Sequence, residues 1–142
     1  MRLLLDTNVL SEVTRPAPDA SVLGWLDELD EDRSFISVVS IAEIRRGVSP
    51  MDEGRKREAL AEWLARDLPQ RFEQRVLPVD DAVALAWGDL MGLAKRRGRG
   101  LSSMDGLIAA TAIAHELTLA TCNTKDFEGF GLELLVVSQF EI

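Results

Sequence analysis

Four acidic residues share one kind of position in the sequence, where an apolar segment meets a helix or a turn: Asp6, Glu43, Asp105 and Asp126. In an open parallel sheet the carboxyl ends of the strands line one crevice, and ligands bind there. Acids far apart in the sequence can therefore meet, and carboxylates that close repel one another unless a divalent cation lies among them. Because hard oxygen ligands favour Mg²⁺ or Mn²⁺, the pattern predicts a site for one of these cations.

The expected strands are what would bring the acids together. Residues 3–5 are a short, wholly apolar run, as in a central strand of a parallel sheet. Segments rich in β-branched and apolar residues predict four further strands, at 34–39, 76–79, 118–122 and 134–137. Pro78 has no N–H to donate within a sheet, so the third strand is expected near an edge.

Helical spacing of apolar residues predicts helices between these strands: one opened by Asp19, a short one at 40–48, a longer one around 60–68, one at 83–94 that Gly98 ends, and one at 104–116. Pro69 is expected to break or bend the third of these helices. The last is apolar nearly all round, which predicts the most buried helix. This alternation predicts a single three-layer α/β/α, Rossmann-like domain over residues 1–142, with a mainly parallel sheet of about five strands.

The composition excludes several classes of protein. The chain has 24 acidic and 16 basic residues, and its net charge of −8 does not favour broad electrostatic affinity for nucleic acid. Cys122 is the only cysteine, so an intrachain disulfide is impossible. The three leucines after Arg2 are too few for a signal-peptide core, and the apolar run 107–114 is too short to cross a bilayer. We expect a cytoplasmic protein that does not associate with membranes.

Taken singly, each acid also has a structural interpretation. Glu43 follows Ser40 at capping-box spacing, and Asp105 ends a similar Ser-Ser-Met-Asp segment. Asp6 is able to cap a helix of its own, and Asp126 fits an exposed turn. Taken together, the acids all fall where one edge of the sheet is expected, which favours a shared site. Polar residues beside them are candidates to orient the carboxylates or metal-bound waters: Thr7, Asn8, Ser103, Thr121 and Asn123.

Four blocks of the sequence resemble the motifs of PIN-domain proteins. They read LLLDTNVL (3–10), SIAEIRRG (40–47), DGLIAATA (105–112) and TCNTKDF (121–127). No single block is very specific, but the blocks run in the family's order and cover nearly the whole chain. The subgroup that they resemble is that of VapC-type toxins, particularly the FitB-like branch.

The resemblance implies a metal-dependent endoribonuclease on a PIN fold, the toxin of a type II toxin–antitoxin pair. It also implies homodimerisation and a cognate VapB-like antitoxin that obstructs the active site. Asp6, Glu43, Asp105 and Asp126 would be the catalytic, metal-binding set. Cys122 is a departure, because the family often has Arg at this position and the substitution removes a positive charge beside the crevice.

Two groups of basic residues are candidates for contacts with RNA phosphates. Arg45 and Arg46 follow Glu43 closely. The densest basic cluster precedes Asp105 and is also interpretable as the cationic end of a helix: Lys95, Arg96, Arg97 and Arg99. Trp25 and Trp63 lie on apolar helix faces, where we expect core packing, a dimer contact or a groove for the antitoxin.

The expected reaction is hydrolysis of an RNA phosphodiester bond by a metal-activated water, with Asp6, Glu43 and Asp105 converging on one cation position. Asp126 would either bind a second ion or orient a metal-bound water. Two alternatives stay open: a non-catalytic interaction module on the same fold, and a phosphoacceptor or phosphatase domain with Asp6 as its nucleophile. The latter would favour a second acid two residues on, where this chain has Asn8.

Overall fold

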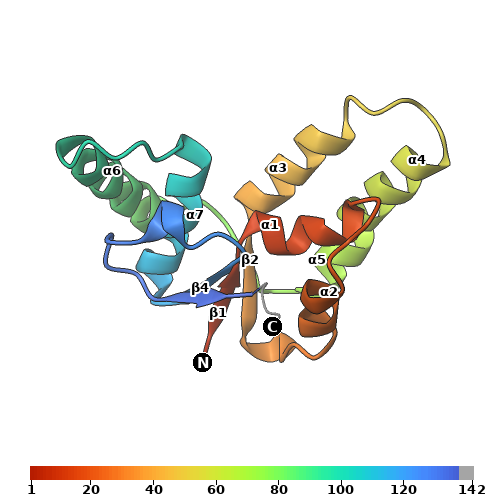
Figure 1. Cartoon of the computed structure of the whole chain (residues 1–142), viewed down its shortest axis with the longest axis horizontal. Helices are drawn as coiled ribbons and strands as arrows, with labels where there is room; N and C mark the ends of the chain where they lie inside the picture. Colours follow the sequence, from red (N-terminus) through yellow and green to blue (C-terminus); the bar gives the residue numbers. More distant parts are fainter. Residues whose placement is uncertain (138–142) are drawn as a thin grey trace.

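A five-stranded sheet lies at the centre of the computed structural model, which describes residues 1–137 (Figure 1). Its strands lie in the order β3 (Val76–Leu77), β2 (Ser34–Ser37), β1 (Leu3–Leu5), β4 (Thr118–Thr121) and β5 (Leu134–Val136). Every adjacent pair is parallel. The predicted sheet is confirmed, and so is the edge position of β3, which ends directly before Pro78. Residues 138–142 of the expected domain lie outside the described residues.

Helices connect the strands and cover both faces of the sheet (Figure 1). They are α1 (Thr7–Leu10), α2 (Ala20–Asp27), α3 (Val38–Val48), α4 (Arg55–Glu62), α5 (Leu68–Arg71), α6 (Asp81–Arg96) and α7 (Ser103–His115). Short 3₁₀ segments are η1 (Ser11–Thr14), η2 (Glu31–Arg33) and η4 (Lys125–Phe127). No helix within residues 1–137 has the length and apolar character needed to cross a bilayer.

The two faces of the sheet carry separate apolar cores. Leu3 and Leu5 of β1 point into a core that includes residues of α2, α3 and α5, whereas Leu4 between them points into a core built largely by α6 and α7. This alternation follows from the two-residue period of side chains along a strand. Because β1 is apolar at all three positions, both faces of the sheet can be covered. The predicted three-layer α/β/α arrangement is confirmed.

The junction between β2 and α3 lies earlier in the chain than the sequence suggested. The strand was expected to continue to residue 39, but it ends at Ser37, whose hydroxyl accepts a hydrogen bond from the amide of Val39 (3.0 Å) and so caps α3. Ser40 was expected as the cap and instead lies in the first turn of the helix. The β-branched pair Val38–Val39 favours a strand by propensity, but the cap and the packing of Val39 in the core decide the outcome.

Pro69 does not end its helix, which was one of the two expected outcomes. The chain runs from α4 through a π-helical turn, η3 (Trp63–Asp67), into α5, and the amide of Leu68 donates to the carbonyl of Trp63 five residues earlier. A proline inside an α-helix lacks an N–H and crowds the carbonyl four residues before it. The wider π turn directly before Pro69 is a local adjustment of the kind that relieves such crowding.

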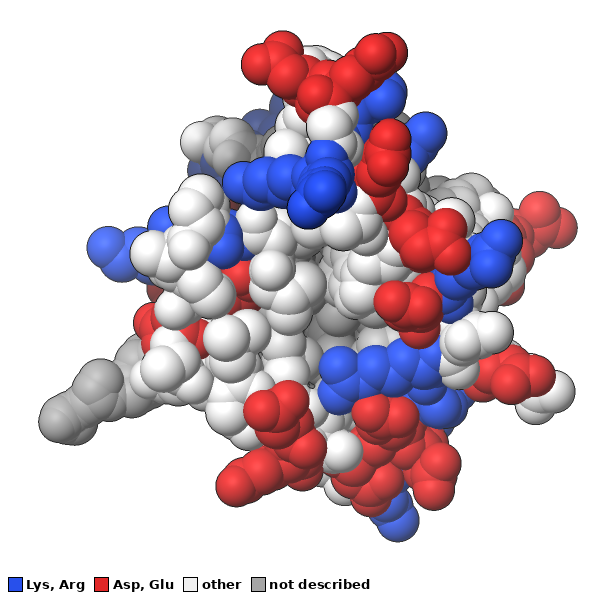
Figure 2. Space-filling model, turned by 90° about the vertical axis from the view of Figure 1, so that its right-hand side faces the viewer, with Lys and Arg blue, Asp and Glu red and all other residues white. Residues whose placement is uncertain are grey.

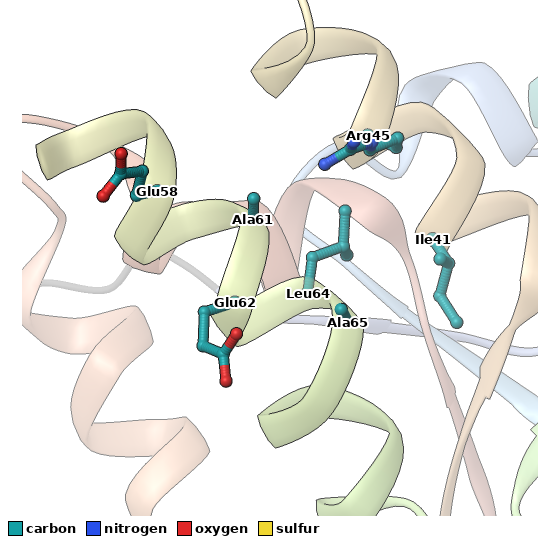
Figure 3. Close-up of a pocket in the computed structure, with 7 residues that line it drawn as sticks. All are labelled: Ile41, Arg45, Glu58, Ala61, Glu62, Leu64 and Ala65. Atoms are coloured by element: carbon teal, nitrogen blue, oxygen red, sulfur yellow. The ribbon is translucent and has the colours of Figure 1, made fainter. Parts of the chain in front are cut away.

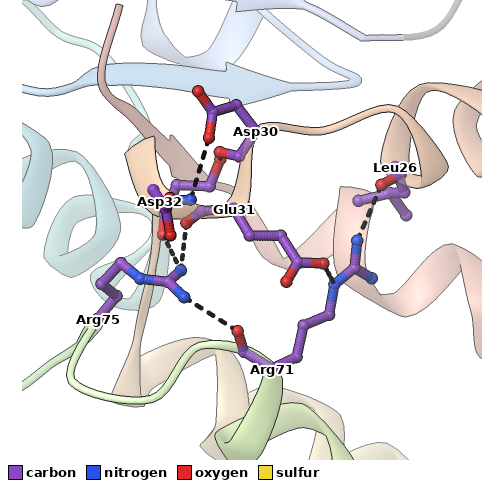
Figure 4. A network of polar contacts seen from close by, with 7 residues as sticks. Leu26, Asp30, Glu31, Asp32, Arg71 and Arg75 are labelled. Atoms are coloured by element: carbon purple, nitrogen blue, oxygen red, sulfur yellow. Dashed lines mark hydrogen bonds and ion pairs between the residues drawn. The ribbon is translucent and has the colours of Figure 1, made fainter.

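Two arginines form hydrogen bonds that connect the end of α5 and the residues after it to the segment that leads into β2 (Figure 4). Arg71 donates to the carboxylate of Glu31 (2.5 Å) and to the carbonyl of Leu26 (2.8 Å). Arg75 donates to the carbonyls of Glu31, Ser34 (3.0 Å) and Arg71 (3.1 Å). Both guanidinium groups also lie against the ring of Phe72, which is wholly buried. This network therefore fixes where β3 begins beside β2.

We expect Arg75→Met to lower the free energy of unfolding by about 1–3 kcal/mol, because three backbone carbonyls lose a charged donor while the aliphatic packing on Phe72 is retained. The measurement is urea denaturation followed by circular dichroism. Arg66→Met is the control, since Arg66 forms only an exposed pair with Glu62 and its loss should cost less than about 1 kcal/mol. Equal effects of the two substitutions would contradict a special role for the network.

Candidate active site

Asp6 lies where the strand order of the sheet reverses. It follows β1, and the neighbouring strand β4 belongs to the other half of the sheet, with β2 and β3 on one side and β4 and β5 on the other. Its amide donates to the carbonyl of Ala120 in β4 (2.8 Å). In open α/β sheets this switch point is where a crevice opens at the carboxyl ends of the strands. The topology therefore places Asp6 at the base of the candidate site.

The carboxylate of Asp6 is almost completely buried and held on both sides. One oxygen accepts from the amide of Thr7 (2.7 Å), and the other accepts from the hydroxyl of Thr121 at the end of β4 (2.8 Å). The pKa of Asp6 is raised to about 6, chiefly because the carboxyl is buried; the hydrogen bonds from Thr121 and Thr7 lower it, and the nearby charges of Asp105 and Glu43 add to the rise. The Asp6 carboxylate is therefore held in one orientation, and its negative charge destabilises the folded chain.

Glu43 is joined to Asp6 through Thr7. The hydroxyl of Thr7 donates to Oε1 of Glu43 (2.7 Å) and lies 2.8 Å from the hydroxyl of Ser40. Since Thr7 gives its one hydroxyl proton to Glu43, Ser40 must be the donor in the second bond. Ser40 is wholly buried, and reasoning from sequence missed this role because the spacing of Ser40 to Glu43 matched a capping box. Thr7 thus orients both acids, one with its backbone and one with its side chain.

Asp105 lies in the first turn of α7, at the same edge of the sheet. Ser102 caps this helix, and its hydroxyl accepts from the amide of Asp105 (3.1 Å). Burial raises the pKa of Asp105, and the charges of Glu43 and Asp126 raise it further, against the effect of the bond to Ser102. The charges of Asp105 and Glu43 also raise the pKa of Asp6, so electrostatic interactions link all four acids.

Asp126 is the most exposed of the four acids and accepts a hydrogen bond from the side-chain amide of Asn123 (3.0 Å). Its loop is held by Arg99, which donates to the carbonyl of Glu128 (2.7 Å) and more weakly to that of Asp126 (3.4 Å). The guanidinium of Arg99 also lies over the ring of Phe130. Arg99 therefore connects the Asp126 loop to the segment that leads into Asp105.

The predicted polar residues divide between the site and its supports. Asn8 donates to the hydroxyl of Thr121 (3.3 Å) and accepts from the amide of Cys122 (3.2 Å), so it joins the loops that follow β1 and β4. Thr121 and Asn123 contact Asp6 and Asp126 directly. Ser103 uses its backbone carbonyl to accept from the indole N–H of Trp87 (3.2 Å), which packs α6 against α7.

The predicted basic residues do not form one surface. Arg46 lines a groove that also includes Thr7 and Glu43, whereas its neighbour Arg45 lines a different groove between α3 and α4 (Figure 3). Arg97 donates to the carbonyl of Gly129, so it supports the same loop as Arg99. Lys95 and Arg96 are exposed at the end of α6. Among these residues, Arg46 shares a groove with one of the four acids, Glu43.

The donor set suits a hard divalent cation, since it consists of coupled carboxylates flanked by hydroxyl and amide groups. Within residues 1–137, no three Asp, Glu, His or Cys side chains already stand in an arrangement that would enclose a metal ion. The expected convergence of Asp6, Glu43 and Asp105 on one cation position stays a prediction. Carboxylates without a compensating charge repel one another, so a bound cation would favour their closer approach.

A model of the PIN domain matches residues 3–131. The chain belongs to the PIN-domain family. It is 41% identical to toxin FitB of Neisseria gonorrhoeae over 88% of this chain and 90% of that protein. It is 37% identical to VapC ribonuclease Y4jK of Sinorhizobium fredii, over 94% of this chain and 95% of that protein. Within the family, the chain therefore groups with the VapC and FitB toxins of type II toxin–antitoxin systems.

The fold comparison agrees with this grouping. The structure of FitAB bound to an IR36 DNA fragment contains a chain that superposes with a TM-score of 0.89 and 36% identity, over 99% of this chain and 98% of that one. The resemblance inferred from the four sequence blocks is confirmed. PIN nucleases are typically metal-dependent, which agrees with the chemistry of the donor set.

The burial of Asp6 makes stability depend on pH. Because folding raises the pKa of this carboxyl from 3.8 to about 6, the folded state binds the proton more tightly than the unfolded state. The resulting stabilisation is fully present below about pH 4 and is lost as the pH rises through about 6. In EDTA at neutral pH, Asp6→Asn should therefore raise the free energy of unfolding by about 1–3 kcal/mol, and this gain should vanish by about pH 4.

Urea denaturation of the two proteins across this pH range checks the expectation. Asp89→Asn is the control, because it removes an exposed carboxylate on α6 and should change stability by less than about 0.5 kcal/mol. A wild-type chain that is more stable than Asp6→Asn at neutral pH in EDTA would show that the carboxylate is stabilising and would contradict this account.

Proposed function

We propose that this chain is a metal-dependent endoribonuclease that hydrolyses RNA phosphodiester bonds, and that it acts as the toxin of its own toxin–antitoxin pair. The observation that carries the proposal is the buried carboxylate of Asp6 at the switch point of the sheet, where the charges of Glu43 and Asp105 act on it and the charge of Asp126 acts on Asp105. A buried charge of this kind costs stability and has no cationic side chain bonded to it among the described residues. A bound cation would offset that cost.

Asp6, Glu43 and Asp105 would hold the cation, Mg²⁺ or Mn²⁺, with Asp126 at the outer side. When bound, the cation supplies a water of lowered pKa and positive charge for the scissile phosphate. Thr121 and the amide of Thr7 keep the Asp6 carboxylate in one orientation, and the Thr7 hydroxyl does the same for Glu43. Asp126, held by Asn123, would bind a second ion or orient the attacking water.

The two alternative functions are less well supported. Asn8, at the position where a phosphatase would favour an acid, is bonded to Thr121 and Cys122. A non-catalytic module would not need four coupled acids at one edge of the sheet. Cleavage by purified protein distinguishes these possibilities from the nuclease.

We expect the purified chain, free of any partner, to cleave RNA with Mg²⁺ or Mn²⁺ and to stop when EDTA is added. Asp6→Asn and Asp105→Asn should each lower the rate by about 100-fold or more, since each removes a charge that holds the cation. Asp89→Asn is the matched control and should leave cleavage unchanged. Gel analysis of a labelled RNA gives the rate for each protein.

Thermal melting gives a second measurement that does not depend on cleavage. Mg²⁺ should raise the melting temperature of the wild-type chain, because a ligand that binds only the folded state stabilises it, and it should not raise that of Asp6→Asn. If Asp105→Asn retains full cleavage and only loses about 1 kcal/mol or less of stability, Asp105 is a helix-capping residue and not a metal ligand.

The proposed partner is an antitoxin that docks in the groove between α3 and α4 (Figure 3). Its lining is mainly apolar, with Ile41, Ala61 and Leu64, and is bordered by Glu58 and Glu62. An amphipathic segment with basic residues would complement this surface, and an arginine beyond it could pair with the acids of the site. The face of the molecule on the side of α4 and α5 shows acidic and basic side chains intermingled around uncoloured surface (Figure 2).

Ala61→Glu should weaken inhibition by the co-expressed neighbouring small protein by about tenfold or more, because it places a charge in the apolar lining. RNA cleavage without the partner should be unchanged. Ala59→Glu, an exposed position on the same helix outside the lining, is the control. Inhibition curves of cleavage against partner concentration measure the effect, and equal inhibition of the two variants would place the partner elsewhere.

A homodimer also stays a proposal. Trp25 and Trp63 are partly buried against the core, so they offer less free surface than their helical positions suggested. Leu85, which is 73% exposed on α6, and Ile113 on α7 present more apolar surface to solvent among the described residues. Contact between two copies through α6 and α7 would cover these side chains.

A further inference from the structure

A groove of about 460 Å³ runs from the acidic site to α4, and its lining combines one acid of the site with three basic residues. Thr7 and Glu43 form its end at the site. Arg15, which follows η1, Arg46 of α3 and Lys56 of α4 also line it. These three basic side chains come from three different elements, and the sequence grouped none of them together.

Helix geometry explains why these side chains share one groove. Arg46 follows Glu43 by three residues, so the two lie on the same face of α3. Lys56 precedes Leu60 by four residues, and both line the groove from one face of α4. The basic side chains therefore lie along a groove that starts at Glu43 and continues towards α4.

The charges of these residues are available to a ligand. Among residues 1–137 the structure shows no hydrogen bond or ion pair for the side chains of Arg46 and Lys56, and both are exposed. Arg15 forms a long contact with Glu12 (3.4 Å) and its side chain remains 65% exposed. By contrast, Arg71, Arg75, Arg97 and Arg99 are used to bind backbone carbonyls.

Gly47 contributes no side chain to the lining of the groove. It lines the groove on α3, and a Cβ atom placed there would meet no atom within 4 Å. A side chain at this position would therefore project into open space in the groove without disturbing the core. Glycine inside a helix is less favourable than alanine by roughly 1 kcal/mol, so its presence here is not explained by helix stability.

We propose that this groove binds the sugar–phosphate backbone of a single-stranded RNA next to the bond that is cut, with Arg15, Arg46 and Lys56 contacting its phosphates. The inference rests on the proposed function, because it takes the acidic site as the place of cleavage. Cations spread over three elements match the repeated charge of a nucleic-acid strand. Apolar side chains between them, including Met51 and Leu60, offer surface for a ribose or a base.

To test whether RNA binds in this groove, we would measure the anisotropy of a fluorescently labelled single-stranded RNA. All proteins would carry Asp6→Asn, so that the RNA is not cleaved during the measurement. Arg46→Gln and Lys56→Gln should each weaken binding by about tenfold and should lower the slope of log K against log salt by about 0.7. Arg55→Gln, the same charge change on an exposed neighbour outside the groove, is the control. Unchanged binding by both groove variants would overturn the proposal.

Gly47→Leu gives a steric test that leaves every charge in place. It should abolish RNA binding without lowering the melting temperature, whereas Gly88→Leu, at an exposed helical glycine of α6 with equally open surroundings, should bind as before. Full RNA binding by Gly47→Leu would contradict RNA binding in the groove. If the groove variants instead lose only inhibition by the protein partner, the groove belongs to that partner and the proposal is wrong.

The outcomes separate the groove from the proposed function. If the groove variants lose RNA binding, the groove is the RNA-binding site, even if the wild-type chain does not cleave RNA. Normal binding by these variants, in a chain that cleaves RNA and depends on Asp6, would reject RNA binding in the groove and leave the nuclease intact.

Discussion

The burial of the Asp6 carboxylate between β1 and β4 is the constraint on which the rest of the site depends. An anion in this position needs hydrogen-bond donors on both sides, and the structure supplies the amide of Thr7 and the hydroxyl of Thr121. Thr7 then has its hydroxyl directed at Glu43, and Thr121 also receives the side chain of Asn8. One buried charge thus fixes the loops that follow two strands far apart in the sequence.

In the absence of a bound ligand, the buried carboxylate of Asp6 destabilises the folded chain. Desolvation raises the pKa of Asp6, and two further carboxylates raise it more. Native proteins are stable by only a few kcal/mol, so a cost of this size at a single side chain is large. A bound cation would offset this cost, and so the burial of Asp6 fits a metal-dependent reaction at this site.

Two groups of basic residues in this acidic chain have different roles. One group holds the framework: Arg71 and Arg75 join α5 to the start of β2, and Arg97 and Arg99 hold the loop of Asp126. The other group remains exposed in the groove beside the acids. Because the net charge is −8, affinity for RNA has to come from such local groups and not from the overall field. Helices α3 and α4 both contribute to this groove and to the apolar one, and Arg46 lines the first whereas Arg45 lines the second.

The sequence by itself determined the order of the elements, the parallel sheet and the edge on which the four acids lie. Those features follow from local apolar patterns and from the rule that parallel strands end at one edge. The tertiary structure alone decided that Ser37 and not Ser40 caps α3, that Ser40 supports Thr7, and that Arg99 holds the Asp126 loop. It also decided that Arg15 and Lys56 share a groove with Glu43. Each of these depends on how helices pack and which way long side chains turn, and contacts between distant residues leave no periodic signal in a single sequence.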